Sequence, residues 1–288
     1  MIFLNYSVVK NYLIEIRRES MKCQYCGKEY VKNESEGIEY LPEFIRKHIE
    51  YIPACDCLEK MKEREREEEI RKQQAESIKN RVKKYRDISV VDSKFLKSTF
   101  EIADMSEKYM KVALRYAKSF MEKKMDIGII FYGGVGTGKT FASGCIANYL
   151  MSRGKSVLVI NLGLYLLKIT KEWGEAESEL LKVVESCDLL IIDDFGMEKS
   201  LEDKNSAWRG EKIYNLIDSR YRCEKPLIIT TNLEFSKDES RCEIAKKLSM
   251  GGKNRIRDRI VEMCYPVEVK GKSRREIDEK KFFKLLEI

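Results

Sequence analysis

Short apolar runs alternate with helical patterns over the C-terminal two thirds of the chain. Most of the runs are bounded by Gly, Pro or Asp, and they occupy residues 127–132, 156–161, 188–193, 226–231 and 265–270. The helical patterns between and after them cover residues 139–152, 162–171, 177–186, 210–222 and 254–263. Continuous apolar strands that alternate with helices indicate a parallel sheet with helices on both faces. Right-handed crossovers then bring the carboxyl ends of the strands to one edge, where ligands bind.

The chain before residue 88 has a different pattern. Residues 58–86 are almost free of Gly, Pro and β-branched residues, and their many charges leave only a thin apolar stripe. This predicts a solvated connecting helix, and the absence of a sustained apolar heptad argues against a coiled coil. Residues 21–57 instead carry paired cysteines together with Gly27, Gly37, Pro42 and Pro53.

The excess of positive charge is concentrated near the C-terminus. The chain has 36% charged residues and a net charge of +7, and residues 241–275 contain eleven Lys or Arg but four acids. Such a basic stretch attracts phosphate, either of a nucleotide or of a nucleic acid, although an ordinary solvated surface is the alternative. No apolar run is long enough to span a membrane and residues 1–20 lack the pattern of a signal peptide, so we expect a cytoplasmic protein with reduced thiols. Residues 1–20, which precede Met21, are expected to be a dispensable extension.

A complete phosphate-binding motif follows the first apolar run. The segment Gly133–Thr140 satisfies G-x-x-x-x-G-K-[ST] and opens a predicted helix. In such a loop the glycines let backbone N–H groups surround a phosphate, Lys139 reaches the β- and γ-phosphates, and Thr140 offers a hydroxyl to Mg²⁺. The residues expected to bind ATP are Gly133, Gly134, Val135, Gly136, Thr137, Gly138, Lys139 and Thr140.

Two further apolar runs end in polar residues. The run 188–193 ends in Asp193 and is followed by Asp194, which suits coordination of Mg²⁺ by Asp193 and activation of the attacking water by Asp194. The alternative is a carboxylate pair that caps the next element, with Gly196 making the turn. The run 226–231 is followed by Asn232, whose amide is placed to sense the γ-phosphate, although Thr-Asn is also ordinary turn chemistry.

Four cysteines form two close pairs. Cys23-x-x-Cys26 and Cys55-x-Cys57 supply the thiolates that tetrahedral zinc requires, and Gly27 suits a tight knuckle turn. The alternatives are four unrelated buried cysteines, a C-x-x-C redox centre, and a site in which His48, the one histidine of the chain, replaces a thiolate. The remaining cysteines have no spacing pattern and are expected in the core: Cys145, Cys187, Cys223, Cys242 and Cys264.

The order of the motifs resembles one group of ATPases. GGVGTGKT, LLIIDDFG, IYNLIDSRY, KPLIITTNL, RIRDRI and GKSRR are similar to the AAA+ ATPases of the DnaC/DnaI helicase-loader group and to IstB-type transposition helpers, over roughly residues 90–285. The resemblance implies an α/β P-loop AAA+ sheet of the ASCE type flanked by helices, with the Asp193 strand between the P-loop strand and its neighbour. Only 18 residues follow Lys270, so we expect no separate helical lid.

Family roles transfer to individual residues by their place in these motifs. Asn232 matches the sensor-1 residue and Arg259 the arginine finger, with Arg255 the next candidate. Arg275 matches the sensor-2 arginine, for which Arg274 is the alternative. Asp194 stands where most AAA+ proteins have Glu, but Asp-Asp is usual in this group. The expected domains are an N-terminal zinc-binding module (1–57), a charged linker helix (58–87) and an AAA+ ATPase domain (88–288).

The leading functional hypothesis is an ATP-dependent loader of the replicative DNA helicase, with ATP, Mg²⁺ and Zn²⁺ as cofactors. The resemblance implies that residues 1–86 bind a hexameric helicase, and that the ATPase domain binds ATP and single-stranded DNA and self-associates on ATP. The basic stretch 241–275 and the region of Trp208 and Tyr214 offer charge and stacking surfaces to DNA, although each of these aromatic side chains taken alone is more typical of the core. The alternatives are an ATPase helper of a DNA transposase and a small-molecule kinase, which would leave Arg259 and the zinc module unexplained.

Overall fold

A computed structural model of the 288-residue chain describes residues 22–89, 93–122, 125–171, 175–196, 206–236, 238–247 and 254–274, with Phe283 and Leu286. The chain divides into two compact units, Met1–Glu76 and Ser77–Ile288. The predicted domain borders at 57/58 and 87/88 remain predictions. Among the described residues, no helix combines the length and the apolar character that a membrane span requires.

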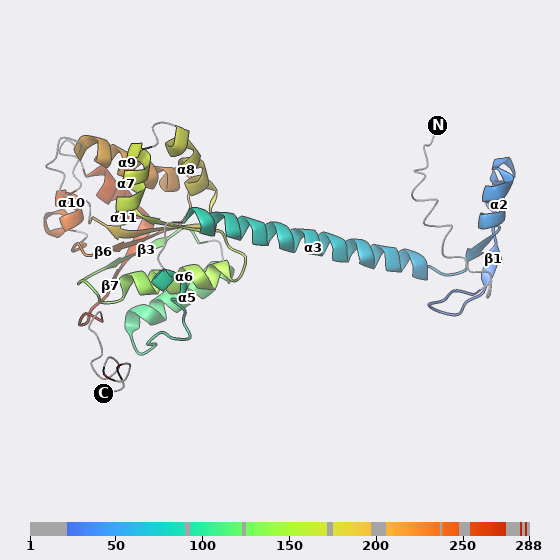
Figure 1. The fold of residues 1–288 in the computed structure, drawn as a ribbon, viewed down its shortest axis with the longest axis horizontal. Coiled ribbons are helices and arrows are strands. Elements are labelled where there is room, and N and C mark those ends of the chain that lie inside the picture. The colour runs from blue at the N-terminus through green and yellow to red at the C-terminus, as the bar shows by residue number, and fades with distance from the viewer. Residues whose placement is uncertain are drawn as a thin grey trace. The chain divides into compact units, whose positions relative to one another are not determined.

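The first unit is a small ribbon with short helices beside it. Its two strands are antiparallel, and Tyr30 of one lies opposite Pro53 of the other. A long helix begins at Cys57 in this unit and continues into the second, as the charged sequence predicts (Figure 1). The elements are β1 (Tyr30–Lys32), η1 (Ile38–Tyr40), α2 (Glu43–Ile49), β2 (Tyr51–Pro53) and α3 (Cys57–Ile88).

The second unit contains the predicted parallel sheet. Its five strands are ordered β4-β5-β6-β3-β7, and every neighbouring pair is parallel. Each strand overlaps one of the predicted apolar runs. Apolar side chains fill both faces of β3, β4, β5 and β6, whereas Tyr265 and Glu268 of the edge strand β7 are exposed. The strands are β3 (Gly128–Tyr132), β4 (Val157–Asn161), β5 (Leu189–Phe195), β6 (Leu227–Thr231) and β7 (Cys264–Glu268).

One expectation about this sheet is wrong. The strand that ends in Asp193 and Asp194, β5, does not lie next to the P-loop strand β3; β6 lies between them. That expectation came from the family resemblance, whereas the strand order depends on where each crossover returns to the sheet. The observed order places the ends of β3, β6 and β5 side by side at one edge of the sheet.

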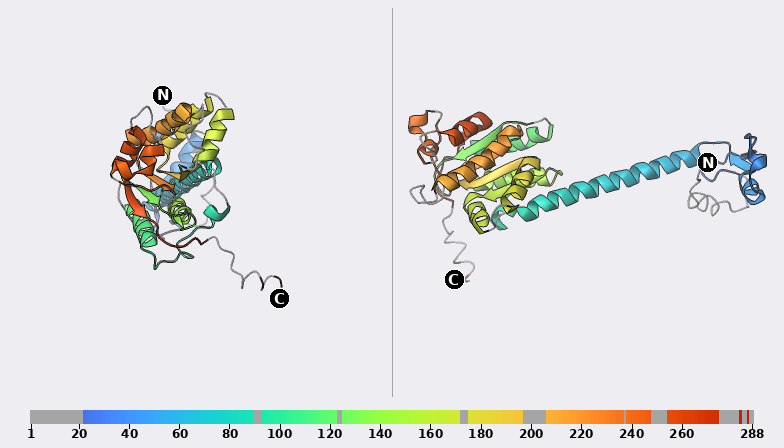
Figure 2. Two further views of the ribbon diagram at one scale, coloured as in Figure 1. Left: turned by 90° about the vertical axis from the view of Figure 1, so that its left-hand side faces the viewer. Right: turned by 90° about the horizontal axis from the view of Figure 1, so that it is seen from above.

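Helices cover both faces of the sheet, as Figures 1 and 2 show. Alternate strand residues pack toward opposite layers: Ile130 and Ile192 join the core under α7, α9 and α11, whereas Ile129 and Ile191 join the core under α5 and α6. The helices are α4 (Ser93–Leu96), α5 (Lys108–Glu122), α6 (Lys139–Met151), α7 (Leu162–Lys171), α8 (Glu175–Ser186), α9 (Ser206–Arg222), η2 (Glu239–Arg241), α10 (Glu243–Lys247) and α11 (Arg255–Met263).

The last turns of α3 belong to the second unit. Tyr85 is 7% exposed, and its hydroxyl lies 2.7 Å from the hydroxyl of Ser186 at the end of α8. Arg81 forms an ion pair of 3.6 Å with Asp188, and the hydroxyl of Ser89 accepts the backbone N–H of Val159 at 2.9 Å. The end of the helix is therefore anchored at the start of β5 and along β4.

Most of the unpatterned cysteines occupy the core, as expected. Cys145, Cys187, Cys242 and Cys264 are buried. Cys223 is exposed, so its expected core position is wrong. It follows the last residue of α9, where the chain turns toward β6 at the surface.

Candidate nucleotide and zinc sites

The P-loop joins the end of β3 to the start of α6. Gly136 has φ 78° and Gly138, which caps α6, has φ 111°, a left-handed region that other residues rarely adopt. A Cβ atom on Gly136 would lie 2.3 Å from the Ser273 hydroxyl, and one on Gly138 would lie 2.7 Å from the Tyr109 hydroxyl. Only glycine fits this path, which leaves backbone N–H groups at a helix N-terminus, a favourable place for a phosphate.

The side chain of Lys139 lies inside this loop. Its exposed fraction is 5%, and its Nζ donates hydrogen bonds to the carbonyls of Gly133 at 2.9 Å and Gly134 at 2.6 Å. The Thr137 hydroxyl also donates to the Gly134 carbonyl, at 2.9 Å. The predicted phosphate-binding cation is thus held at the centre of the loop, where an anion would meet both its charge and the helix N-terminus.

Thr140 and Asp193 meet across the sheet edge. The Thr140 hydroxyl donates to Oδ1 of Asp193 at 2.9 Å, so the first residues of α6 contact the end of β5. A hydroxyl and a carboxylate are oxygen ligands of the kind that Mg²⁺ prefers, and the pair therefore fits this ion. Asp194 is half-buried beside them with φ 56°, again in the left-handed region.

Thr230 is a residue of this site that the sequence reasoning missed. Its hydroxyl donates to Oδ1 of Asp193 at 2.6 Å and accepts the backbone N–H of Asp194 at 3.0 Å. The available signal was the polar end of the apolar run 226–231, where Thr230 and Thr231 precede Asn232. Asn232 lies two residues further along, half-buried, at the end of the strand that separates β3 from β5.

The segment after β7 lies against the P-loop. The backbone N–H of Arg274 donates to the carbonyl of Gly136 at 2.9 Å, and the Arg274 guanidinium forms an ion pair of 2.6 Å with Glu107. Arg274 is therefore close to the nucleotide site through its backbone. Arg275, the expected sensor-2 residue, lies outside the described residues.

Arg259 lies on α11 and contacts α9. Its guanidinium forms an ion pair of 3.1 Å with Asp218 and stacks 3.6 Å above the ring of Tyr221. Burial opposes the charged form, but a hydrogen bond with Tyr214 and the charge of Asp218 outweigh it and raise the pKa of Arg259. The expected arginine finger is thus held by residues of α9 in its own subunit.

The two aromatic residues expected to stack on DNA are packed inward. Trp208 and Tyr214 are half-buried on α9 and pack against the core beneath that helix. The Tyr214 hydroxyl donates to Asp218 at 3.3 Å. Both rings are thus partly buried, and their role as stacking surfaces stays a prediction.

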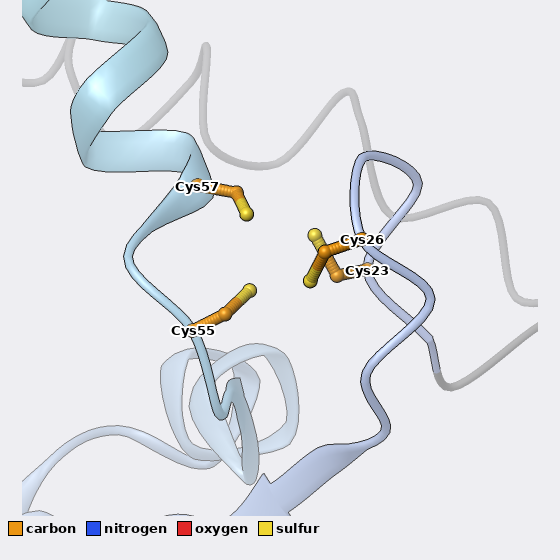
Figure 3. A group of neighbouring side chains, drawn as sticks. All are labelled: Cys23, Cys26, Cys55 and Cys57. Atoms are coloured by element: carbon orange, nitrogen blue, oxygen red, sulfur yellow. The ribbon is translucent and has the colours of Figure 1, made fainter.

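The four paired cysteines converge in the first unit (Figure 3). The sulfurs of Cys23, Cys26, Cys55 and Cys57 all lie within 4.8 Å of one another. A tetrahedral zinc site with bonds of about 2.3 Å separates its sulfurs by roughly 3.8 Å, so this cluster is compatible with zinc. Gly27, with φ 73°, makes the turn after the first pair, and its N–H donates to the Cys23 carbonyl at 2.8 Å.

The thiols of this cluster influence one another. Hydrogen bonds from the backbone at Tyr25 and Cys26 lower the pKa of Cys23 to about 7, whereas the hydrogen bond with the Cys26 side chain and burial raise the pKa of Cys57 to about 12. Gathered thiolates repel each other, and a bound cation would offset that repulsion. His48 is exposed on α2 and donates to the Phe44 carbonyl, outside the four-cysteine group.

Comparison with known proteins places these sites in a family context. The family described as "IstB-like ATP binding protein" matches residues 49–281. The replicative helicase loader DnaC of Escherichia coli K12 is 33% identical over 126 residues, which are 42% of this chain and 49% of the relative. The DnaC loader of Buchnera aphidicola from Schizaphis graminum is 30% identical over 135 residues, 46% of this chain and 52% of the relative.

Among solved structures, the crystal structure of DnaI matches with a TM-score of 0.52 and 26% identity, covering 65% of this chain and 95% of that chain. The matched part of the chain spans about half the length of the curated relatives. The likeness to DnaI, the order of the strands and the geometry of the P-loop all indicate the same ATPase fold.

Proposed function

The chain belongs to the IstB-like ATP-binding protein family, and we propose that it is an ATP-dependent loader of a replicative DNA helicase. The fold and the family indicate an ATPase of the AAA+ class. The observation that supports the loader role is the similarity to relatives named replicative helicase loader DnaC, together with the likeness to DnaI. The role of the whole protein is a proposal, because the alignment covers half of those relatives.

The geometry suggests a separate role for each group of residues at the nucleotide. The P-loop amides and Lys139 would hold the phosphates of ATP, and Thr140 with Asp193 would hold Mg²⁺, which neutralises charge on the phosphates when bound. Asp194 would orient the attacking water, and Asn232 would contact it or the γ-phosphate from the end of β6. Arg259 lies on α11 and pairs with Asp218 of α9, and from there it would reach the γ-phosphate of ATP bound to a neighbouring subunit.

Two substitutions test the nucleotide site. Lys139→Ala removes the charge at the phosphates and should weaken binding of fluorescent ATP with Mg²⁺ by at least about tenfold, or ~1.4 kcal/mol. Asp194→Ala should bind ATP and fail to hydrolyse it. Lys118→Ala removes an equally charged but exposed side chain from α5 and is the control. Unchanged affinity in Lys139→Ala would overturn the assignment of the site.

The first unit is the proposed contact for the helicase. The second unit carries the P-loop, Asp193 and Asn232, so the four-cysteine module is available to bind a partner protein. Size-exclusion chromatography with a hexameric replicative helicase tests this with the fragments 1–76 and 77–288. A cut at this place keeps Tyr85 in the ATPase unit, which a cut at residue 88 would not. Fragment 1–76 should co-elute with the helicase, and fragment 77–288 should bind ATP and elute alone.

The family description itself favours a second candidate, an ATPase helper of a DNA transposase. The two candidates differ in what the first unit binds. If fragment 1–76 ignores the helicase and instead retains a transposase or double-stranded DNA, the transposition role replaces the loader role. Substituting Cys55→Ser in the full chain provides a matched control, since it should remove the partner contact and leave ATP binding intact.

A further inference from the structure

The end of β5 contains an irregularity at its two aspartates. Ile192 of β5 lies opposite Ile229 of β6, and the next registered pair is Phe195 with Thr231. Asp193 and Asp194 therefore lie opposite one residue, Thr230. Two residues facing one is the arrangement of a β-bulge, which interrupts the ladder and redirects the side chains of the bulged strand. The left-handed φ of Asp194, 56°, is part of this distortion.

The Thr230 side chain compensates for the interrupted ladder. Its exposed fraction is 0%, and its hydroxyl accepts the Asp194 N–H at 3.0 Å in place of a backbone carbonyl. Because that N–H occupies the acceptor side, the hydroxyl proton points to Oδ1 of Asp193, 2.6 Å away. One hydroxyl thus restrains the carboxylate of Asp193 and the backbone of Asp194 together.

We propose that Thr230 is a positioning residue for the metal and water groups of the nucleotide site. Oδ1 of Asp193 receives the Thr140 hydroxyl from the P-loop side and the Thr230 hydroxyl from the β6 side, so its orientation is determined before a cation binds. Without the Thr230 hydroxyl, Asp193 loses one of these two hydrogen bonds and the Asp194 N–H loses its acceptor inside the protein. This inference rests on the proposed ATP hydrolysis and adds a residue that controls its dependence on Mg²⁺.

A pair of substitutions separates the hydroxyl from the space it fills. Thr230→Val keeps the shape and removes the hydroxyl, whereas Thr230→Ser keeps the hydroxyl. In the full chain, Thr230→Val should raise the Mg²⁺ concentration for half-maximal tight binding of fluorescent ATP by roughly 10- to 100-fold, as expected for a residue that orients a metal ligand. Its affinity for ATP in EDTA should match the wild type, and Thr230→Ser should behave as the wild type in both measurements.

Thr231→Val is the matched control. Thr231 is 1% exposed on the same strand, but its hydroxyl donates to the Phe195 carbonyl at 2.7 Å and does not contact either aspartate carboxylate among the described bonds. It should lower thermal stability without shifting the Mg²⁺ titration. If Thr230→Val does not fold, Thr230→Ala removes the same hydroxyl with a smaller side chain.

The outcomes distinguish this inference from the function on which it rests. A wild-type protein that neither binds nor hydrolyses ATP would overturn the proposed function. If the wild type does both and the Mg²⁺ midpoint of Thr230→Val shifts by less than about twofold, Thr230 has no positioning role and the inference alone fails. An equal Mg²⁺ shift in Thr231→Val would also overturn it, since any loosening of β6 would then have the same effect.

Discussion

Arg259 differs from the other proposed catalytic residues because its partners lie on a neighbouring helix. Asp218 binds Arg259 at 3.1 Å and Arg222 at 3.1 Å, and it accepts the Tyr214 hydroxyl. The carboxylate has several partners, so Arg259 can exchange Asp218 for a phosphate without leaving a buried unpaired charge. This arrangement suits an arginine that is presented to another subunit.

Arg259→Ala is therefore expected to leave ATP binding unchanged and to lower the assembled ATPase rate by roughly 100-fold or more. The control is Arg222→Ala, which removes the other arginine of Asp218 but from the exposed end of α9. Steady-state ATPase at rising protein concentration is the measurement.

Mixing two inactive variants is a second test of the proposal that Arg259 acts on a neighbouring subunit. Arg259→Ala and Lys139→Ala proteins each retain what the other lacks, so their mixture should recover part of the activity. Full activity of Arg259→Ala alone under assembling conditions would move the finger to Arg255, which is exposed at the start of α11.

Arg220 shows how much a residue's role depends on its surroundings. It belongs to the motif IYNLIDSRY, but its exposed fraction is 0% and it contacts no phosphate-binding residue among its described partners. Its guanidinium donates to the carbonyls of Val184, Cys187, Asp188 and Pro226. These bonds join α9 to the starts of β5 and β6, so the arginine stabilises the strands that carry the residues of the nucleotide site.

At the scale of elements, α3 is divided between two environments. Ile70 is 54% exposed, whereas Tyr85 near the end of the same helix is buried in the core of the second unit. The apolar stripe of the sequence was too thin to reveal this, because one buried tyrosine and an ion pair anchor the helix rather than a continuous apolar face.

Tyr85→Ala should destabilise the second unit by about 3 kcal/mol, the cost of removing a large buried aromatic side chain. Tyr85→Phe should cost about 1 kcal/mol, since it loses only the contact with the Ser186 hydroxyl. Ile70→Ala is the control and should change little. Both tryptophans of the chain lie in the second unit, so urea unfolding followed by tryptophan fluorescence reports this difference.

The four-cysteine cluster depends on two elements that are distant in sequence. The turn at Cys23 and Cys26 meets the start of α3 at Cys55 and Cys57, and the ribbon of β1 and β2 brings them together. With short strands and much exposed surface, this unit has little core to hold it.

We therefore expect about one zinc ion per chain, and loss of structure over residues 22–57 when zinc is removed by a chelator. Elemental analysis of reduced protein and amide hydrogen exchange measure the two effects. Cys55→Ser should abolish zinc binding, whereas Cys223→Ser, at an exposed thiol outside the cluster, should retain it. Freshly prepared, reduced protein without metal would contradict the assignment.

At the scale of the whole molecule, the basic stretch remains the proposed contact for single-stranded DNA. Its exposed members in the described part of the chain are Arg241, Lys246, Arg255, Lys270, Lys272 and Arg274. Because Trp208 and Tyr214 pack inward, we expect charge rather than base stacking by these two rings to dominate binding.

Binding of labelled single-stranded DNA should accordingly fall steeply with salt, with a log–log slope of about −0.7 for each phosphate neutralised. Fluorescence anisotropy over a salt series, with ATP present, measures it. Lys272→Glu should weaken binding and reduce the slope, and Lys118→Glu on α5 should not. A slope near zero would remove single-stranded DNA from the list of proposed partners.

Local sequence was sufficient for the elements and for the P-loop. The five strands of the parallel sheet and the helices α6, α7, α8, α9 and α11 lie within a few residues of their predicted positions, because the periodicity of buried side chains is a local property. The short helix α10, between β6 and β7, was not predicted. Close spacing along the chain also limits how far the two thiols of each cysteine pair can separate, whereas the pairing of β1 with β2 brings the two pairs together. Family motifs added Arg259 and Arg275 and gave Asn232 its sensor-1 assignment, and these roles remain proposals.

The chain's own sequence thus determined approximately where each strand lies, and hence that the P-loop follows the carboxyl end of one strand and that Asp193 lies near the carboxyl end of another. Only the tertiary structure decided that β6 separates β3 from β5, and so that Thr230 of β6, together with Thr140 of the P-loop, contacts the aspartates. It also decided that Arg220 is buried and that Tyr85 belongs to the core. These features depend on which segments become neighbours after the chain crosses over the sheet, and that information is distributed over the whole packed interior rather than carried by any local pattern.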